Sequence, residues 1–218
     1  MFTHVIFDLD GTLLNSLEDL ADATNWVCEK HGWPVHSLEA YKYFIGNGAA
    51  KLVARAVPED VELTEELHKQ ILDEFTLRYA AHKADKTCPY PGLPELLAQL
   101  KEKGIVTAVL TNKPDVAAKS VVEQYYPNLL GEVQGALPGK PTKPDPTVLY
   151  ELMERIGATR EPTLFVGDSN VDIQVANNGG LTSCGVLWGF RTREELQGEG
   201  ATYLAQTASE LEDVILNK

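Results

Sequence analysis

Residues 3–12 read THVIFDLDGT, and the fold class can be worked out from this stretch outward. Residues 3–7 form an apolar, β-branched run that stops at acidic residues, which is typical of a buried strand ending in a loop. Alternation along an extended backbone places the carboxylates of Asp8 and Asp10 on the same side of the chain. Gly11 then permits the tight turn by which the chain leaves this position. The stretch therefore predicts a buried strand that delivers two carboxylates to its carboxyl end.

The next segment, residues 15–83, has the apolar spacing of helices and contains no stretch typical of a strand. Ser16 followed by Asp19 predicts a capping box at the start of its first helix. Gly32 and the glycines at 46 and 48 interrupt the pattern, as helix ends do. We therefore expect an all-helical cap domain inserted after the first strand.

Strands and helices alternate along the remaining residues, 84–218. Strands are expected at 105–110, 163–166 and 184–188, and helices at 95–103, 114–124, 147–156, 171–178 and 209–216. Such alternation implies a parallel sheet with helices on both faces. The sequence thus predicts an α/β fold, a Rossmann-like parallel sheet core flanked by helices. Residues 1–14 and 84–218 would form this core, with residues 15–83 as the helical cap.

Composition and charge limit the classes of partner. The 218 residues include 19 Lys and Arg against 32 Asp and Glu, a formal net charge of −13. Such a surface repels phosphate backbones, so nucleic-acid binding is not expected. No apolar run approaches the roughly 20 residues of a membrane span, and no export signal is expected. Three separate cysteines favour reduced thiols in a cytoplasmic protein. A monomer or a homodimer is expected.

Ligands of open α/β sheets bind beyond the carboxyl ends of the strands, so the loops there hold the candidate site. Asp168 and Asp172 follow the strand at 163–166 and would share a sheet edge with Asp8 and Asp10. Four acids gathered there are costly without compensation, because like charges repel. A hard, oxygen-seeking ion such as Mg²⁺ would relieve this repulsion.

Two further loops at the same edge supply polar and cationic groups. Thr111 and Asn112 close the strand at 105–110 with a hydroxyl and an amide that suit an anionic oxygen. Lys143 stands in a loop stiffened by prolines, where it would neutralise carboxylates or hold a phosphoryl group. Lys140 is the competing lysine. A carboxylate nucleophile, a second acid, an anion clamp and a cation together suit phosphoryl transfer.

Four motifs carry a resemblance to a known family. They are D-x-D-G-T at 8–12, T-N at 111–112, K-P-D-P at 143–146 and G-D-x-x-x-D at 167–172. In this order, each after an expected strand, they resemble the motifs of haloacid dehalogenase-superfamily phosphatases over nearly the whole chain. The helical block resembles the small cap of this family.

The resemblance is greatest to the phosphoglycolate phosphatase-like subgroup. The sequences that suggest it are IGNG at 45–48, TNKP at 111–114 and WGF at 188–190. The resemblance implies a hydrolase of small phosphate monoesters, with 2-phosphoglycolate as the substrate. A dehalogenase is not favoured, because Asp10 and the second acidic pair would have no task there.

The family's catalytic roles carry over to matching residues. The resemblance implies that Asp8 is the nucleophile that forms an aspartyl-phosphate. Asp10 would protonate the leaving alcohol and then activate water. Thr111, Asn112 and Lys143 would hold the transferring group.

The family's metal site also maps onto this sequence. The resemblance implies that Mg²⁺ is bound by the side chains of Asp8 and Asp168 and by the carbonyl of Asp10. Asp172 would either bind the metal through a water molecule or orient Lys143.

Substrate choice leaves alternatives open. Gly48 begins a helix whose amide groups, together with Lys51, would meet an anion of a small phosphorylated metabolite. A phosphoryl mutase of the β-phosphoglucomutase type would use the same core residues, and so would a pyrophosphatase or a nucleotidase. A receiver-like signalling domain or a non-catalytic binding protein is a more distant alternative, because the full catalytic set is present.

Overall fold

The computed structural model describes all residues, 1–218, in two compact units. The core unit comprises Met1–Asn15 and Pro89–Lys218, and the helical unit comprises Ser16–Cys88. Two short strands, β2 (Leu14–Asn15) and β3 (Cys88–Pro89), pair where the chain passes from one unit to the other. None of the helices combines the length and apolarity needed to cross a membrane.

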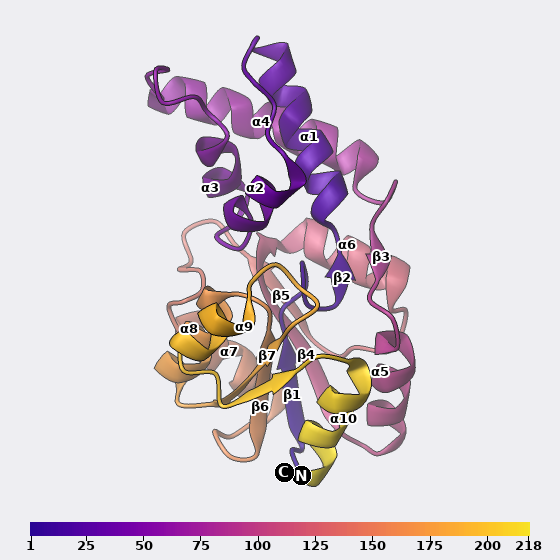
Figure 1. Ribbon diagram of the computed structural model, residues 1–218. Helices are drawn as coiled ribbons and strands as arrows, with labels where there is room; N and C mark the ends of the chain where they lie inside the picture. The colour runs from indigo at the N-terminus through magenta and orange to yellow at the C-terminus, as the bar shows by residue number, and fades with distance from the viewer. The chain divides into compact units, whose positions relative to one another are not determined.

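The core unit is a six-stranded sheet with helices on both faces, which confirms the predicted α/β class (Figure 1). The strands are β1 (His4–Phe7), β4 (Val106–Pro114), β5 (Val133–Ala136), β6 (Thr163–Gly167), β7 (Thr182–Val186) and β8 (Tyr203–Ala205). The helices are α5 (Leu93–Glu102), α6 (Asp115–Tyr125), α7 (Thr147–Ile156), α8 (Asn170–Gly179), α9 (Arg193–Gly198) and α10 (Ala208–Asn217). All neighbouring strands run parallel in the order β5-β4-β1-β6-β7-β8.

Strand β1 is apolar on both sides because both faces of the sheet are covered. Val5 and Phe7 pack with α5, α6 and α10, whereas Ile6 packs with α7 and α8 on the other face. Figure 1 shows α7 and α8 on one side of the sheet and α5 and α10 on the other. The successive apolar residues of β1 are therefore explained by its central position in the sheet, where both of its faces are buried.

Two strands of the six-stranded sheet and one helix of the core unit were not predicted. Strands β5 and β8 are short, and the sequence of β5, VQGA, lacks the apolar character of a buried strand. These strands are held by pairing with β4 and β7, which the local sequence does not reveal. Helix α9 is a six-residue helix with a capping box between Thr192 and Glu195.

The helical unit contains four helices and no strand apart from β3 at its boundary, as the apolar spacing predicted. They are α1 (Leu17–Lys30), α2 (Leu38–Phe44), α3 (Ala49–Arg55) and α4 (Glu65–His82). The predicted capping box at Ser16 is wrong, because the Ser16 side chain makes no capping hydrogen bond. The carboxylate of Asp19 instead accepts hydrogen bonds from the backbone of Lys86 and Thr87 at the far end of the unit.

Register brings the polar strand ends of the core unit together. Phe7 of β1 lies opposite Val109 of β4 on one side and Val166 of β6 on the other. Asp8 follows Phe7 directly, and Thr111 and Asp168 each lie two residues beyond the partner of Phe7. β4 also continues to Pro114, so its polar end belongs to the strand rather than to a turn. The three strand ends therefore meet at the position where β1 has neighbours from both halves of the sheet.

Candidate active site

Three buried carboxylates lie together at these strand ends. We call Asp8, Asp168 and Asp172 the acidic triad, since an oxygen of each lies within 4.8 Å of the others. Asp8 follows β1, while Asp168 and Asp172 lie at the junction of β6 and α8. Asp168 and Asp172 are fully buried. Acids in such a position require compensation by donors, by a cation or by protonation.

The carboxylate of Asp168 is held on both oxygens. The Thr12 hydroxyl donates to Oδ1 at 2.8 Å, and the Phe190 backbone N–H donates to Oδ2 at 2.9 Å. Glycines give it room: a Cβ at Gly11 would lie 2.3 Å from Oδ2, and a Cβ at Gly189 2.2 Å from the Asp168 Cβ. The sequence WGF at 188–190 therefore contributes space and an N–H donor to the triad.

Asp172 is held by the start of its own helix and by a lysine. Its Oδ2 accepts from the backbone N–H of Ser169 at 3.0 Å and from the Ser169 hydroxyl at 2.6 Å. Its Oδ1 accepts from Lys143 Nζ at 2.6 Å. A Cβ at Gly167 would overlap the Asp172 side chain, so this position requires glycine. The G-D-x-x-x-D motif thus fixes both acids that follow β6.

Lys143 provides the cation of the triad. Its Nζ lies 2.8 Å from Asp8 Oδ1 and 2.6 Å from Asp172 Oδ1, and the side chain is buried. Asn112 orients it, because the Asn112 amide donates to the Lys143 carbonyl and accepts from the Lys143 N–H. The competing Lys140 is exposed and pairs with Glu151. Asn112, expected to hold an anion, thus also connects β4 to the lysine loop.

Burial and like charge disturb the titration of this cluster. Burial, then the charge of Asp172, raises the pKa of Asp8 to about 6 despite the nearby Lys143. Burial and the charges of Asp172 and Asp8 raise the pKa of Asp168 to about 8. Burial works against the Lys143 ammonium, but the two neighbouring carboxylates outweigh it and raise its pKa. The cluster therefore has more negative charge than its single lysine compensates.

The residues of the triad fit a divalent cation. Asp8 Oδ1 is buried and accepts no hydrogen bond, although Lys143 lies at ion-pair distance. All three groups offer hard carboxylate oxygens, the ligands that Mg²⁺ and Ca²⁺ prefer. Three crowded carboxylates that share one lysine are the arrangement that a bound cation relieves.

Asp10 lies in a different environment from the triad. Its carboxylate is not one of the three grouped oxygens, and both of its oxygens accept from Lys113 Nζ at 3.0 Å. From the sequence alone, Lys113 belongs to the polar strand end, and no partner is predicted for it. The register of β4 shifts between Leu110 and Pro114, so strict alternation does not place Lys113, and its sequence signal is that it adjoins Thr111 and Asn112.

The residues predicted to select the substrate lie in the helical unit. Gly48 has a φ of 87° and precedes α3, and Lys51 is exposed on that helix. The Arg55 guanidinium donates to the carbonyls of Tyr43 and Phe44. Arg55 therefore fixes the end of α2, where the segment containing Gly48 begins.

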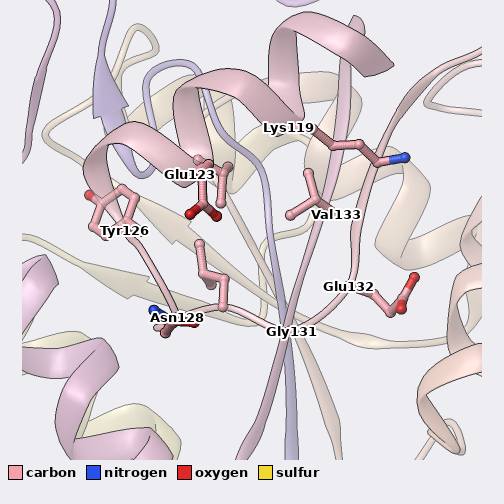
Figure 2. Close-up of a pocket in the computed structure, with 9 residues that line it drawn as sticks. Lys119, Glu123, Tyr126, Asn128, Gly131, Glu132 and Val133 are labelled. Carbon is pink, nitrogen blue, oxygen red and sulfur yellow. The ribbon is translucent and has the colours of Figure 1, made fainter.

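A separate cavity of about 380 Å³ lies between α6 and the segment leading to β5 (Figure 2). It is lined by Lys119, Val122, Glu123, Tyr126, Asn128, Leu130, Gly131, Glu132 and Val133. Its charged residues are exposed, and it contains none of the strand-end acids. The chemistry of the core unit is therefore concentrated at the acidic triad.

Comparisons with known proteins agree with this geometry. The family model for haloacid dehalogenase-like hydrolases matches residues 5–186. A phosphoglycolate phosphatase of Vibrio parahaemolyticus is 34% identical over 223 residues, 97% of this chain and 95% of the relative. A phosphoglycolate phosphatase of Haemophilus influenzae is 37% identical over 195 residues, 87% of each.

A solved structure shares the whole architecture. It is described as a candidate phosphoglycolate phosphatase of Lactobacillus delbrueckii and is 32% identical, with a TM-score of 0.92. The match covers 100% of this chain and 99% of that one. The resemblance carried by the four motifs is thereby confirmed, and the chain belongs to the haloacid dehalogenase-like hydrolases.

Proposed function

We propose that this protein is a Mg²⁺-dependent phosphatase of small phosphate monoesters, with 2-phosphoglycolate as its substrate. The observation that carries the proposal is the buried Asp8 carboxylate, whose Oδ1 accepts no hydrogen bond beside Lys143 and two further acids. Relatives named phosphoglycolate phosphatase, at 34% to 37% identity, support the choice of substrate.

In the first step, an Asp8 carboxylate oxygen attacks phosphorus and the bond from phosphorus to the ester oxygen breaks. Asp10, in its protonated form, gives its proton to the departing alkoxide, which leaves as an alcohol. The products are an aspartyl-phosphate on Asp8 and an Asp10 carboxylate. Lys143, beside Asp8 at 2.8 Å, stabilises the charge that develops on the phosphoryl oxygens.

In the second step, water attacks the phosphorus of the aspartyl-phosphate and the bond to Asp8 breaks. The Asp10 carboxylate takes a proton from this water as its oxygen bonds to phosphorus. Free Asp8 and inorganic phosphate result, and Asp10 is protonated again for the next cycle. Thr111, buried at the end of β4, donates its hydroxyl to a phosphoryl oxygen, with Asn112 beside it.

The metal would be held by the side chains of Asp8 and Asp168 and by the Asp10 carbonyl, with Asp172 acting through water or through Lys143. When bound, Mg²⁺ supplies charge that offsets the approach of an anionic phosphate to a carboxylate nucleophile. The protein's own contribution is positioning. Thr12 and the Phe190 N–H fix Asp168, and Ser169 fixes Asp172.

We propose that residues of the helical unit select the substrate. Lys51 is exposed, and we propose that it and the backbone at Gly48 recognise the carboxylate of phosphoglycolate. Lys51→Met is expected to raise KM for 2-phosphoglycolate and to leave KM for an alkyl phosphate without a carboxylate unchanged. Equal effects on both substrates would contradict this assignment.

The function is tested by phosphate release across a panel of esters, with Mg²⁺ or with EDTA. The panel contains 2-phosphoglycolate, sugar phosphates, nucleotides, pyrophosphate and a nitrophenyl phosphate. We expect strong preference for 2-phosphoglycolate, loss of activity in EDTA and recovery when Mg²⁺ is added back. Flat, weak activity would keep a phosphatase but remove this substrate, and transfer of phosphate to a sugar hydroxyl rather than water would indicate a mutase.

A further inference from the structure

A second buried lysine lies beside the acidic triad without belonging to it. The Lys113 side chain is 3% exposed and that of Asp10 is 12% exposed. Lys113 Nζ lies 3.0 Å from both Asp10 oxygens, although the two residues are 103 positions apart in sequence. A lysine that donates to both oxygens of one carboxylate restrains rotation of that carboxylate about the Cβ–Cγ bond.

Lys113 is not needed to neutralise the triad, since Lys143 performs that task from another loop. The Lys113 ammonium is instead directed to the one strand-end carboxylate that lies outside the triad. We propose that Lys113 is a positioning residue that holds Asp10 for proton transfer to the departing alkoxide oxygen. This inference rests on the proposed function.

Both ends of the contact are fixed by the backbone. On one side, the Gly11 N–H donates to the Leu14 carbonyl at 2.8 Å, which closes the turn that follows Asp10. On the other, the Lys113 N–H lies 3.3 Å from the hydroxyl oxygen of Thr111 at the end of β4. The lysine is therefore anchored on the strand that also provides the phosphoryl-binding hydroxyl.

The consequence of this arrangement depends on the leaving group. An alkoxide such as the one released from phosphoglycolate is strongly basic and needs a proton as its bond to phosphorus breaks. A nitrophenolate is a weak base and leaves without one. Loss of Lys113 therefore affects alkyl esters selectively if the lysine acts through Asp10, and all esters equally if it binds the phosphoryl group.

The test compares kcat/KM of Lys113→Met on 2-phosphoglycolate and on nitrophenyl phosphate. This parameter reports the steps up to release of the leaving group, which makes it independent of the later hydrolysis step. We expect a loss of about 100-fold on 2-phosphoglycolate and of less than about 3-fold on the nitrophenyl ester. Lys140→Met, which removes an exposed lysine, is the matched control and should change neither value.

A double-mutant cycle shows whether Lys113 acts through its partner. The Asp10→Asn/Lys113→Met double variant should lose no more kcat/KM on 2-phosphoglycolate than Asp10→Asn alone. Lys113→Arg, which keeps a two-pronged donor, should recover part of the lost activity. Equal losses on both esters, or multiplicative losses in the double variant, would overturn the inference.

Failure of the proposed function and failure of the role of Lys113 give different results. A wild-type protein that hydrolyses neither ester contradicts the proposed function itself, and with it the role of Lys113. If Lys113→Met does not fold, Lys113→Gln keeps a polar side chain there but lacks the ammonium and is too short to hold both Asp10 oxygens. The same selective loss on 2-phosphoglycolate is then expected, and an equal loss on the two esters again contradicts the inference.

Discussion

The helical unit and the core unit both bury carboxylates, but they compensate them differently. In the helical unit, the 2% exposed Asp19 accepts hydrogen bonds from the Lys86 N–H and from both the N–H and the hydroxyl of Thr87. In the core unit, Asp8 Oδ1 accepts none, although a lysine lies nearby. The first arrangement ties two ends of a unit together, whereas the second leaves an oxygen available for chemistry.

The pKa values express the same contrast. In the helical unit, burial works to raise the pKa of Glu74, but three donors outweigh it and lower the pKa to about 2. Those donors are Gln70, Lys30 and His31. In the core unit, burial and neighbouring acids raise the pKa of Asp168 to about 8. Burial alone therefore does not mark a functional acid; the balance of donors and like charges does.

The largest effect is expected for Asp8→Asn. The amide nitrogen cannot attack phosphorus as the carboxylate does, so turnover should fall by about 1,000-fold or more. Removing one of three crowded charges should leave the fold intact. Phosphate release and circular dichroism of the variant check both statements. A variant that keeps more than a tenth of wild-type activity would contradict the assignment of Asp8 as the nucleophile.

The next largest effect is expected in the helical unit, on stability. Asp19→Ala leaves the backbone donors of Lys86 and Thr87 buried without an acceptor, at a cost of about 3 kcal/mol. Urea unfolding of the variant measures this loss in the free energy of unfolding. A change below about 0.5 kcal/mol would show that Asp19 does not tie the two ends of the helical unit together.

Removal of metal should make stability depend on pH. Because folding raises the pKa of Asp8 to about 6 and of Asp168 to about 8, the native state binds more protons than the unfolded state. The free energy of unfolding in EDTA should therefore fall as the pH rises from about 4 to about 8. Mg²⁺ should reduce this fall, since the cation takes the place of the protons.

Urea unfolding at several pH values, in EDTA and in Mg²⁺, provides the measurement. Asp168→Asn removes one of the two perturbed groups and should flatten the EDTA profile. A stability that rises with pH in EDTA would mean that the triad is compensated without a cation.

The smallest effect is expected for Glu74→Gln. Its partner Lys30 is 48% exposed, so solvent screens the pair and the expected loss is about 1 kcal/mol near neutral pH. Since folding lowers the pKa of Glu74 to about 2, this contribution is present above about pH 4.5 and is lost as the pH falls to about 2. Unfolding curves of both proteins across this range check the sign, and a difference that grows toward acid pH would contradict it.

Much of this arrangement could be predicted from the sequence, because it depends on local periodicity. The apolar run before Asp8 indicated a buried strand, and alternating strands and helices indicated a parallel sheet. Parallel strands end at one edge, so Asp8 and Asp168 were expected to meet. These inferences need only the geometry of a strand and the rule for ligand sites in such sheets.

The rest depends on contacts between distant segments. Strand β5 is held by its pairing with β4 rather than by its own apolar residues. The Phe190 N–H reaches Asp168 only because a glycine precedes it, and Lys113 reaches Asp10 across 103 positions. Asp19 resembled a capping residue by its spacing from Ser16. Its carboxylate instead accepts hydrogen bonds from backbone N–H groups near the carboxyl-terminal end of the helical unit. Spacing identifies candidates, but tertiary pairing decides their partners.

The most direct test is a calorimetric titration of Mg²⁺ into the metal-free protein, near pH 7. We expect one Mg²⁺ bound per chain by the wild type and at least tenfold weaker binding by Asp168→Asn, which loses a triad carboxylate. Glu74→Gln, which loses a carboxylate of the helical unit, should bind Mg²⁺ as the wild type does. Equal affinity of Asp168→Asn and the wild type would contradict the claim that the under-compensated acids of the core unit form the metal site.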